Sequence, residues 1–172
     1  IRNVSKRIKI DASLLIYSTS SLSRTMTREI RRLEPYTRFQ GSVDEKEIIA
    51  EMMKFDVLVH AESFTRKIKH KTRLSISTKI PEYLATGKHL LAVGPADISS
   101  IKYLKRTGAA IVASCSDIIY LESAVLRTIE AKKNDRVCGR NNINLAKKNH
   151  SSEETRRKVF AIVSKAVMNR GS

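Results

Sequence analysis

Short apolar runs alternate with amphipathic stretches along most of this 172-residue chain. The runs are nearly continuous in their apolar character, as expected of strands that are covered on both faces. The stretches between them place apolar residues at helical spacing. The pattern predicts five strands, at residues 13–17, 38–43, 56–60, 89–94 and 109–113.

Capping residues give approximate ends to the helices between these strands. Asp44 and Asp117 are predicted to begin helices, because aspartate is a favoured N-cap. Gly87 and Gly108 are predicted to end helices, because glycine readily adopts the left-handed conformation that follows a last turn. The expected helices lie at residues 24–34, 44–54, 77–87, 97–104, 117–131, 142–148 and 153–169.

This alternation predicts an α/β protein with a Rossmann-like, doubly wound parallel sheet of five to six strands and helices on both faces. The length fits one domain over residues 1–172, ending in the helix at 153–169. The chain opens without Met in a basic stretch at residues 1–10, so we expect it to belong to a longer polypeptide. Ligands of such sheets bind beyond the carboxyl ends of the strands. The loops that follow the strands are therefore the places to search for a site.

The charge is the extreme feature of the composition. The sequence has 33 Lys and Arg residues and 17 Asp and Glu residues, which gives a net charge of +16. Such a field attracts nucleic acid, acidic membrane surfaces and phosphate-bearing ligands alike. The basic segment at residues 64–73 suits an anionic lipid, a lipid-linked acceptor or nucleic acid, or is a solvated surface loop. Aromatic residues make up only 5% and Trp is absent, which argues against a nucleic-acid surface built on stacked rings.

Several chemistries have little support in the sequence. Cys115 and Cys138 cannot form a dense disulfide framework, and we interpret them as free thiols in a reducing, cytoplasmic setting. No apolar run is long enough to span a membrane, and the first residues lack a signal-peptide pattern. No metal is expected, because there is no Asp-x-Asp pair and the histidines stand singly. They lie at positions 60, 70, 89 and 150.

The most informative motif is the stretch at residues 77–87. A helix beginning at Thr78 directs amides and the positive end of its dipole toward an anion. The hydroxyls of Ser77 and Thr78 add donors, and Lys79 adds a mobile charge. Glu82 follows one turn later, where a carboxylate can accept two hydrogen bonds from a vicinal diol such as a ribose. The same residues also fit ordinary helix capping, and both interpretations stay open.

Two other strand ends carry candidate residues. Gly41, Ser42 and Val43 lie at the end of the second strand, where glycine allows a flat ligand to approach the backbone or simply forms a turn. Glu62 follows the third strand, where it is either a site carboxylate or a solvated loop residue. Neither a Gly-x-Gly-x-x-Gly fingerprint nor a Walker-type loop is present.

Residues 77–95 read Ser-Thr-Lys-Ile-Pro-Glu-Tyr-Leu-Ala-Thr-Gly-Lys-His-Leu-Leu-Ala-Val-Gly-Pro. This stretch resembles the signature of the C-terminal domain of family 4-type glycosyltransferases with the GT-B fold, Lys-x-x-Glu-Tyr-Leu-Ala-x-Gly-Lys-Pro before an apolar strand. Residues 39–43, 55–62 and 149–150 are similar to segments that flank that signature. The resemblance covers about residues 13–167.

The resemblance implies a hexosyltransferase that transfers a sugar from a nucleotide-sugar donor to a glycan or lipid-linked acceptor in cell-surface polysaccharide synthesis. It implies that this chain is the donor-binding, C-terminal half of a GT-B enzyme, with an N-terminal domain as its partner and no metal cofactor. The isolated half is expected to bind the donor without turnover. Association with the inner face of the membrane fits a lipid-linked acceptor.

The resemblance also assigns roles to residues. Glu82 would hold the ribose hydroxyls, the helix start at residues 77–79 would face the diphosphate, and residues 41–43 would contact the base through their backbone. Glu62 is a candidate near the sugar. Many members of the family carry a further glutamate eight positions before the ribose-binding one, and here that position is Leu74.

Two other functions remain as alternatives. A GT-B-type nucleotide-sugar epimerase would need catalytic carboxylates and a histidine near the sugar. A basic nucleic-acid-binding module would fit the charge but needs a helix that reads a groove or a sheet face bearing rings. No catalytic residue is assigned from the sequence.

Overall fold

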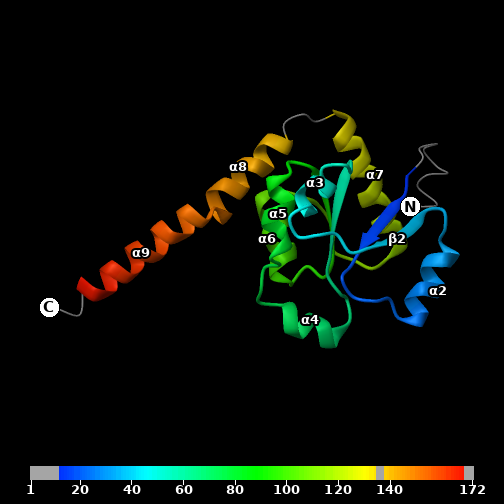
Figure 1. The fold of residues 1–172 in the computed structure, drawn as a ribbon, viewed down its shortest axis with the longest axis horizontal. Helices are drawn as coiled ribbons and strands as arrows, with labels where there is room; N and C mark the ends of the chain where they lie inside the picture. The colour runs from blue at the N-terminus through cyan, green and yellow to red at the C-terminus, as the bar shows by residue number, and fades with distance from the viewer. Residues whose placement is uncertain (1–11, 135–137, 169–172) are drawn as a thin grey trace.

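A computed structural model describes residues 12–134 and 138–168. Strands and helices alternate along the chain, and a long helical arm extends from the body (Figure 1). Each of the five predicted strands is present, within a few residues of its expected ends. They are β1 (Leu14–Tyr17), β2 (Thr37–Gly41), β3 (Val57–Ala61), β4 (His89–Val93) and β5 (Ile111–Ala113). The basic stretch at residues 1–10 and the predicted end of the last helix at Asn169 lie outside the described residues.

The strands form two parallel sheets, so the expectation of one sheet with five to six strands is not met. β1 pairs with β2, and β3, β4 and β5 pair in that order. β1 has only four residues, none of them buried, and side chains connect its sheet to the rest. The Tyr17 hydroxyl donates to Glu51 Oε1 at 2.8 Å, and the Tyr17 ring packs edge-on against Phe55 at 5.9 Å. The α/β class with parallel strands is confirmed.

A helix is present at each predicted place, with ends shifted by up to four residues, and two differences are of another kind. The basic segment, for which a solvated loop had been one interpretation, forms helix α4 between Arg66 and Thr72. Asp44 does not cap a helix, because its carboxylate accepts from the Lys46 amide at 2.9 Å and the following turn delays the helix to Ile48. The helices are α2 (Arg24–Arg32), α3 (Ile48–Met52), α4 (Arg66–Thr72), α5 (Lys79–Ala85), α6 (Ser99–Thr107), α7 (Ile118–Asn134), α8 (Cys138–His150) and α9 (Ser152–Met168).

The core lies on both faces of the three-stranded sheet. Along β4, Leu90 and Ala92 pack in one cluster with residues of α5 and α6, whereas Leu91 packs in a second cluster with Ala124 of α7. Successive side chains of a strand point to opposite faces, so this division places helices on both sides of the sheet, as the continuous apolar runs had predicted.

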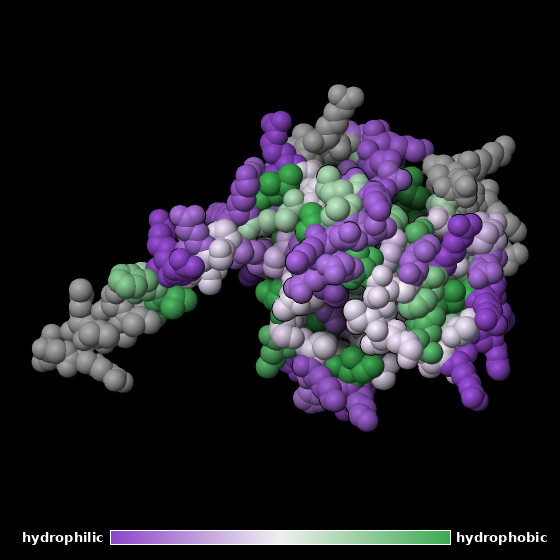
Figure 2. All heavy atoms as spheres, viewed as in Figure 1, coloured by the Kyte–Doolittle hydropathy of each residue, from purple (hydrophilic) through white to green (hydrophobic). Residues whose placement is uncertain are grey.

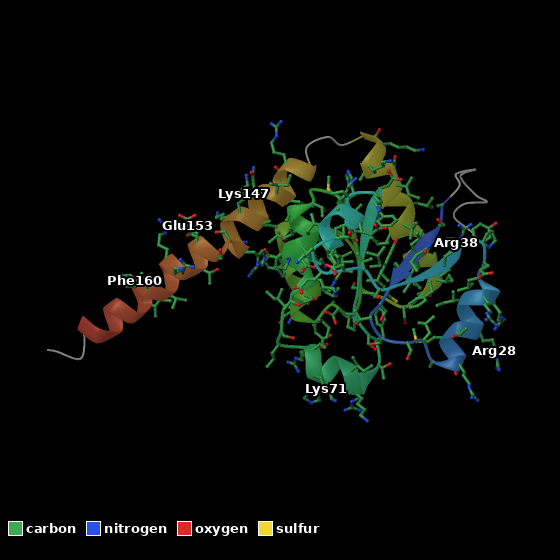
Figure 3. All side chains as sticks on the ribbon, viewed as in Figure 1. Arg28, Arg38, Lys71, Lys147, Glu153 and Phe160 are labelled. Carbon is green, nitrogen blue, oxygen red and sulfur yellow. The ribbon has the colours of Figure 1, made fainter. Side chains whose placement is uncertain are left out.

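Helix α8 is anchored to the body and α9 leads away from it (Figures 1 and 3). The Asn142 side-chain amide donates to the backbone carbonyls of Lys88, at 3.3 Å, and Ala109, at 3.2 Å. On α9, Val159, Phe160 and Ile162 are exposed. Within the described ranges, no helix combines the length and the apolar character that crossing a membrane requires.

Candidate functional site

Two of the candidate loops lie at one edge of the three-stranded sheet, where β3 and β4 have their carboxyl ends. Strand-like hydrogen bonds continue past the strands, because the Glu62 amide donates to the Val93 carbonyl at 2.8 Å and the Gly94 amide donates to the Ala113 carbonyl at 3.1 Å. This is the edge at which parallel sheets bind ligands. Glu62 is therefore held on regular backbone at the position where a site is expected.

Gly94 allows Glu62 to approach closely. A Cβ added at Gly94 would lie 2.6 Å from Glu62 Cβ and 3.1 Å from Cδ1 of Ile101. Contacts below about 3 Å between such atoms are repulsive, so only glycine fits here without movement of its neighbours. The packing around Gly94 fixes where the Glu62 side chain begins.

Glu62 forms a buried pair with His60 of β3. His60 Nε2 lies 3.2 Å from Glu62 Oε1, and the two side chains are only 6% and 11% exposed. The interpretation of Glu62 as a solvated loop residue is therefore wrong. The His60 ring also packs edge-on against Tyr83 of α5, with centroids 6.2 Å apart. These contacts connect the end of β3 to the helix that carries Glu82.

Burial lowers the pKa of His60, although the Glu62 carboxylate acts in the opposite direction. Burial also lowers the pKa of His150, whose Nε2 lies 2.8 Å from the Tyr103 hydroxyl. Both imidazoles are therefore held neutral in the fold more strongly than in the unfolded chain, where the pKa is about 6.5.

We expect the stability of the chain to fall as the pH is lowered from about 7.5 to about 5.5, because the unfolded state then binds more protons than the folded state. Urea denaturation at a series of pH values measures this slope. The variant His60→Gln is expected to reduce the slope, whereas His70→Gln, at an exposed position, leaves it unchanged. An equal slope in His60→Gln and the parent chain contradicts the prediction.

Helix α5 begins at Lys79, one residue after the predicted start at Thr78. Ser77 accepts hydrogen bonds from two amides of its first turn. The Lys79 amide donates to Ser77 Oγ at 3.4 Å, and the Ile80 amide donates to the Ser77 carbonyl at 3.1 Å. Pro81 has no amide hydrogen. Of the leading amides, the one at Thr78 donates to no acceptor in the described part of the chain. Thr78 and Lys79 are exposed, so this amide and the Lys79 ammonium remain for an anion.

Glu82 lies in the first turn of α5 and is half-buried. Its Oε2 has no solvent contact and accepts no hydrogen bond from any residue that the structure describes. A buried carboxylate oxygen without a donor costs free energy, and such atoms are rare in folded proteins. Burial and the neighbouring Glu82 carboxylate raise the pKa of Tyr83. Glu82 Oε2 is thus a buried acceptor with no donor among the described residues.

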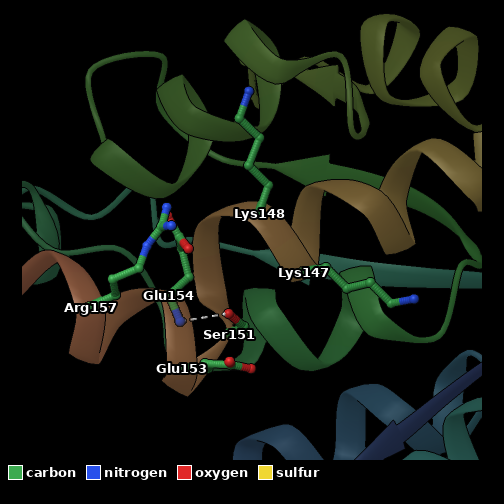
Figure 4. Close-up of a pocket in the computed structure, with 6 residues that line it drawn as sticks. All are labelled: Lys147, Lys148, Ser151, Glu153, Glu154 and Arg157. Carbon is green, nitrogen blue, oxygen red and sulfur yellow. Dashed lines mark hydrogen bonds and ion pairs between the residues drawn. The ribbon is translucent and has the colours of Figure 1, made fainter.

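Two surface hollows lie away from these residues, against α8. Figure 4 shows the first, of about 350 Å³, where α8 meets α9. Ser151 Oγ accepts from the Glu154 amide at 3.1 Å, and Arg157 pairs with Glu154 at 3.1 Å. These contacts begin α9 in the Ser-x-x-Glu pattern of a capping box, which accounts for Ser151, Glu154 and Arg157. The second hollow lies between the end of α6 and α8.

The structure brings some predicted site residues together and leaves others apart. Glu62 and the α5 residues lie at the edge of the three-stranded sheet, connected through His60 and Tyr83. Gly41 is the last residue of β2 in the two-stranded sheet, and Ser42 and Val43 follow it. Gly41 adopts φ +81°, a conformation that favours glycine. The structure shows no hydrogen bond between residues 41–43 and residues 77–82.

Sequence reasoning missed the roles of His60 and Tyr83. The signal for His60 was available, because residues two apart on a strand share a face. His60 therefore lies on the same side as Glu62. Among residues 12–134 and 138–168, no group of three or more His, Cys, Asp or Glu side chains is arranged to hold a metal ion.

Comparison with models of known families and with curated proteins finds no match to this chain.

Proposed function

We propose that this chain is the donor-binding half of a GT-B glycosyltransferase, which holds the nucleotide diphosphate part of a nucleotide sugar. The observation that carries the proposal is the Glu82 carboxylate, whose buried Oε2 has no donor in the described chain. The two hydroxyls of a ribose are donors of the right kind for such a group. The resemblance of residues 77–95 to the family 4-type signature supports the same role for Glu82.

The surroundings of Glu82 fit the other parts of the donor. The exposed Lys79 and the Thr78 amide lie one turn before Glu82, where they would meet the diphosphate. Glu62, paired with His60, is the carboxylate nearest to a sugar in this proposal. Residues 41–43 would contact the base. A second domain would supply the acceptor and any general base, which is why we expect the isolated chain to bind without turnover.

Glu82 must turn its covered oxygen toward the ligand in order to bind it. Oε2 lies beneath other atoms, and neither of the two hollows is lined by Glu82. Binding is thus expected to be accompanied by a local change at α5. The carboxylate gains hydrogen bonds in that change, which offsets the cost of displacing its cover.

The proposal is tested by thermal melting with UDP, GDP and ADP in about 0.15 M salt. A nucleotide at about 100 times its Kd adds about 2.7 kcal/mol of stability, or about 5–10 °C for a chain of this size. We expect one of the three nucleotides to raise the Tm in this way and Glu82→Gln to abolish most of the shift. The matched control is Glu130→Gln, at an exposed position on α7, which should retain it.

Two results separate the proposal from its alternatives. A shift that persists in Glu82→Gln shows that this carboxylate does not bind the ribose. Stabilisation by duplex DNA alone, with a steep dependence on salt, indicates nucleic-acid binding instead. In the absence of nucleotide, Glu82→Gln is expected to melt close to the parent chain, because Gln has the same shape and Glu82 Oε2 has no donor among the described residues to lose.

A further inference from the structure

Helix α4 and the loops beside it carry an exposed surface that is both basic and apolar. We call it the α4 surface. Figure 2 shows hydrophobic atoms among strongly hydrophilic ones at the lower edge of the body, where Figure 3 labels Lys71 on α4. The α4 surface consists of Phe64, Arg66, Lys67, Ile68, Lys71, Arg73, Leu74 and Ile76.

The charge of this surface has a single sign. Between Glu62 and Glu82 the chain has six Lys and Arg residues and no Asp or Glu. In the part of the chain that the structure describes, Arg66, Lys67, Lys71 and Arg73 take part in no ion pair. No carboxylate among the described residues neutralises this charge, which is complementary to a dense array of anions.

The apolar residues of the α4 surface are exposed to an unusual degree. Leu74 is 88% exposed, and Phe64, Ile68 and Ile76 are 38%, 48% and 44% exposed. Phe64 precedes α4, Ile68 lies within it, and Leu74 and Ile76 follow it. Large apolar side chains gathered at an exposed site indicate an interaction surface.

The α4 surface lies outside the core, although the backbone that follows α4 is hydrogen-bonded to the body. No described residue of α4 is buried, and α4 has no extensive packing against another helix or strand of the described chain. The backbone beyond it is anchored, because the Ser99 amide and Ser99 Oγ both donate to the Arg73 carbonyl, at 3.0 and 2.8 Å. A helix of seven residues is marginal in water without packing, so a partner would stabilise α4.

We propose that the α4 surface binds the anionic surface of a lipid bilayer. Phe64, Ile68, Leu74 and Ile76 enter the boundary between headgroups and acyl chains, and the cations contact lipid phosphates. Nucleic acid would satisfy the cations, but its surface offers no apolar layer for three aliphatic side chains. The inference depends on this surface alone and not on the donor site.

Sedimentation of the full chain with vesicles tests the proposal. Vesicles of phosphatidylcholine containing phosphatidylglycerol are expected to bind the protein, and vesicles of phosphatidylcholine alone to bind it far more weakly. Lys67→Glu with Lys71→Glu should weaken partitioning at least tenfold, since each cation lost lowers it about fivefold. Ile68→Ser with Leu74→Ser should also weaken it, and the loss should persist at about 0.5 M salt because apolar contacts are not screened.

The matched control is Lys102→Glu with Lys105→Glu on α6, which makes the same change in charge at exposed positions elsewhere. It should retain most of the binding. Circular dichroism shows whether each variant is folded, and Lys67→Gln with Lys71→Gln is a milder substitute. Equal losses from the α4 and α6 variants overturn the proposal, because net charge alone would then explain the binding. Binding to duplex DNA that requires Lys67 and Lys71, without binding to anionic vesicles, also overturns it.

Discussion

Replacing Leu84 with alanine is expected to lower the free energy of unfolding by about 2–5 kcal/mol. Leu84 is fully buried on α5, in the cluster that joins this helix to α6 and the sheet. Its truncation removes apolar contacts and leaves a cavity beneath the helix that carries Glu82. Urea denaturation followed by circular dichroism measures the loss.

Leu74→Ala is the matched control for this change. The residue type and the substitution are the same, but Leu74 is 88% exposed and should cost less than about 0.5 kcal/mol. Similar losses at positions 74 and 84 would mean that α5 does not pack on the sheet as the structure shows.

Gly87→Ala is expected to cost about 2–4 kcal/mol, from two physical sources. Gly87 has φ +66°, a left-handed conformation in which a Cβ is unfavourable. The added Cβ would also lie 2.9 Å from Ile143 Cδ1 and 3.1 Å from the Gly139 carbonyl oxygen. The substitution thus pushes α8 away from the end of α5, and thermal melting together with urea denaturation measures the result.

Gly108→Ala separates the two sources. Gly108 also has φ +66°, but a Cβ there would have no atom within 4 Å. This variant should therefore show the conformational cost alone, about 1–2 kcal/mol. If both variants lose the same stability, the close approach of α5 and α8 contributes nothing.

The sequence was sufficient to place the strands, because buried parallel strands leave a clear apolar signal. Gly87 and Gly108 also marked their helix ends correctly, since both positions require a positive φ that other residues rarely adopt. The division into two sheets was not predictable in this way. It depends on whether β1 pairs with β3, and periodicity carries no information about which strands are neighbours.

Helix α4 was not predicted, because its composition gives no helical pattern of apolar residues. Five of its seven residues are Lys, Arg or His, and Ile68 is its one apolar residue, so no periodic apolar face could be recognised. Asp44 shows the opposite error. Its side chain does bond to a nearby amide, but two residues on rather than at a helix start, and both arrangements suit aspartate.

For the candidate site, the sequence predicted the position of Glu82 but not its surroundings. The first turn of α5 follows from Pro81 and the preceding hydroxyl residues. That Ser77 occupies the leading amides depends on packing against Ser100, whose Oγ accepts from the Ser77 amide at 3.0 Å. Those two residues are 23 positions apart in the chain. The covering of Glu82 Oε2 likewise results from packing that no local pattern reveals.

The two hydrogen bonds from the Asn142 side chain show that the body of the molecule needs α8 to satisfy two of its backbone carbonyls. This side chain, 2% exposed, donates to Lys88, which immediately precedes β4, and to Ala109, two residues before β5. Without α8, the carbonyls of Lys88 and Ala109 would lose this donor, and the second of these residues is 2% exposed. An autonomous folding unit therefore extends at least through the part of α8 that carries Asn142.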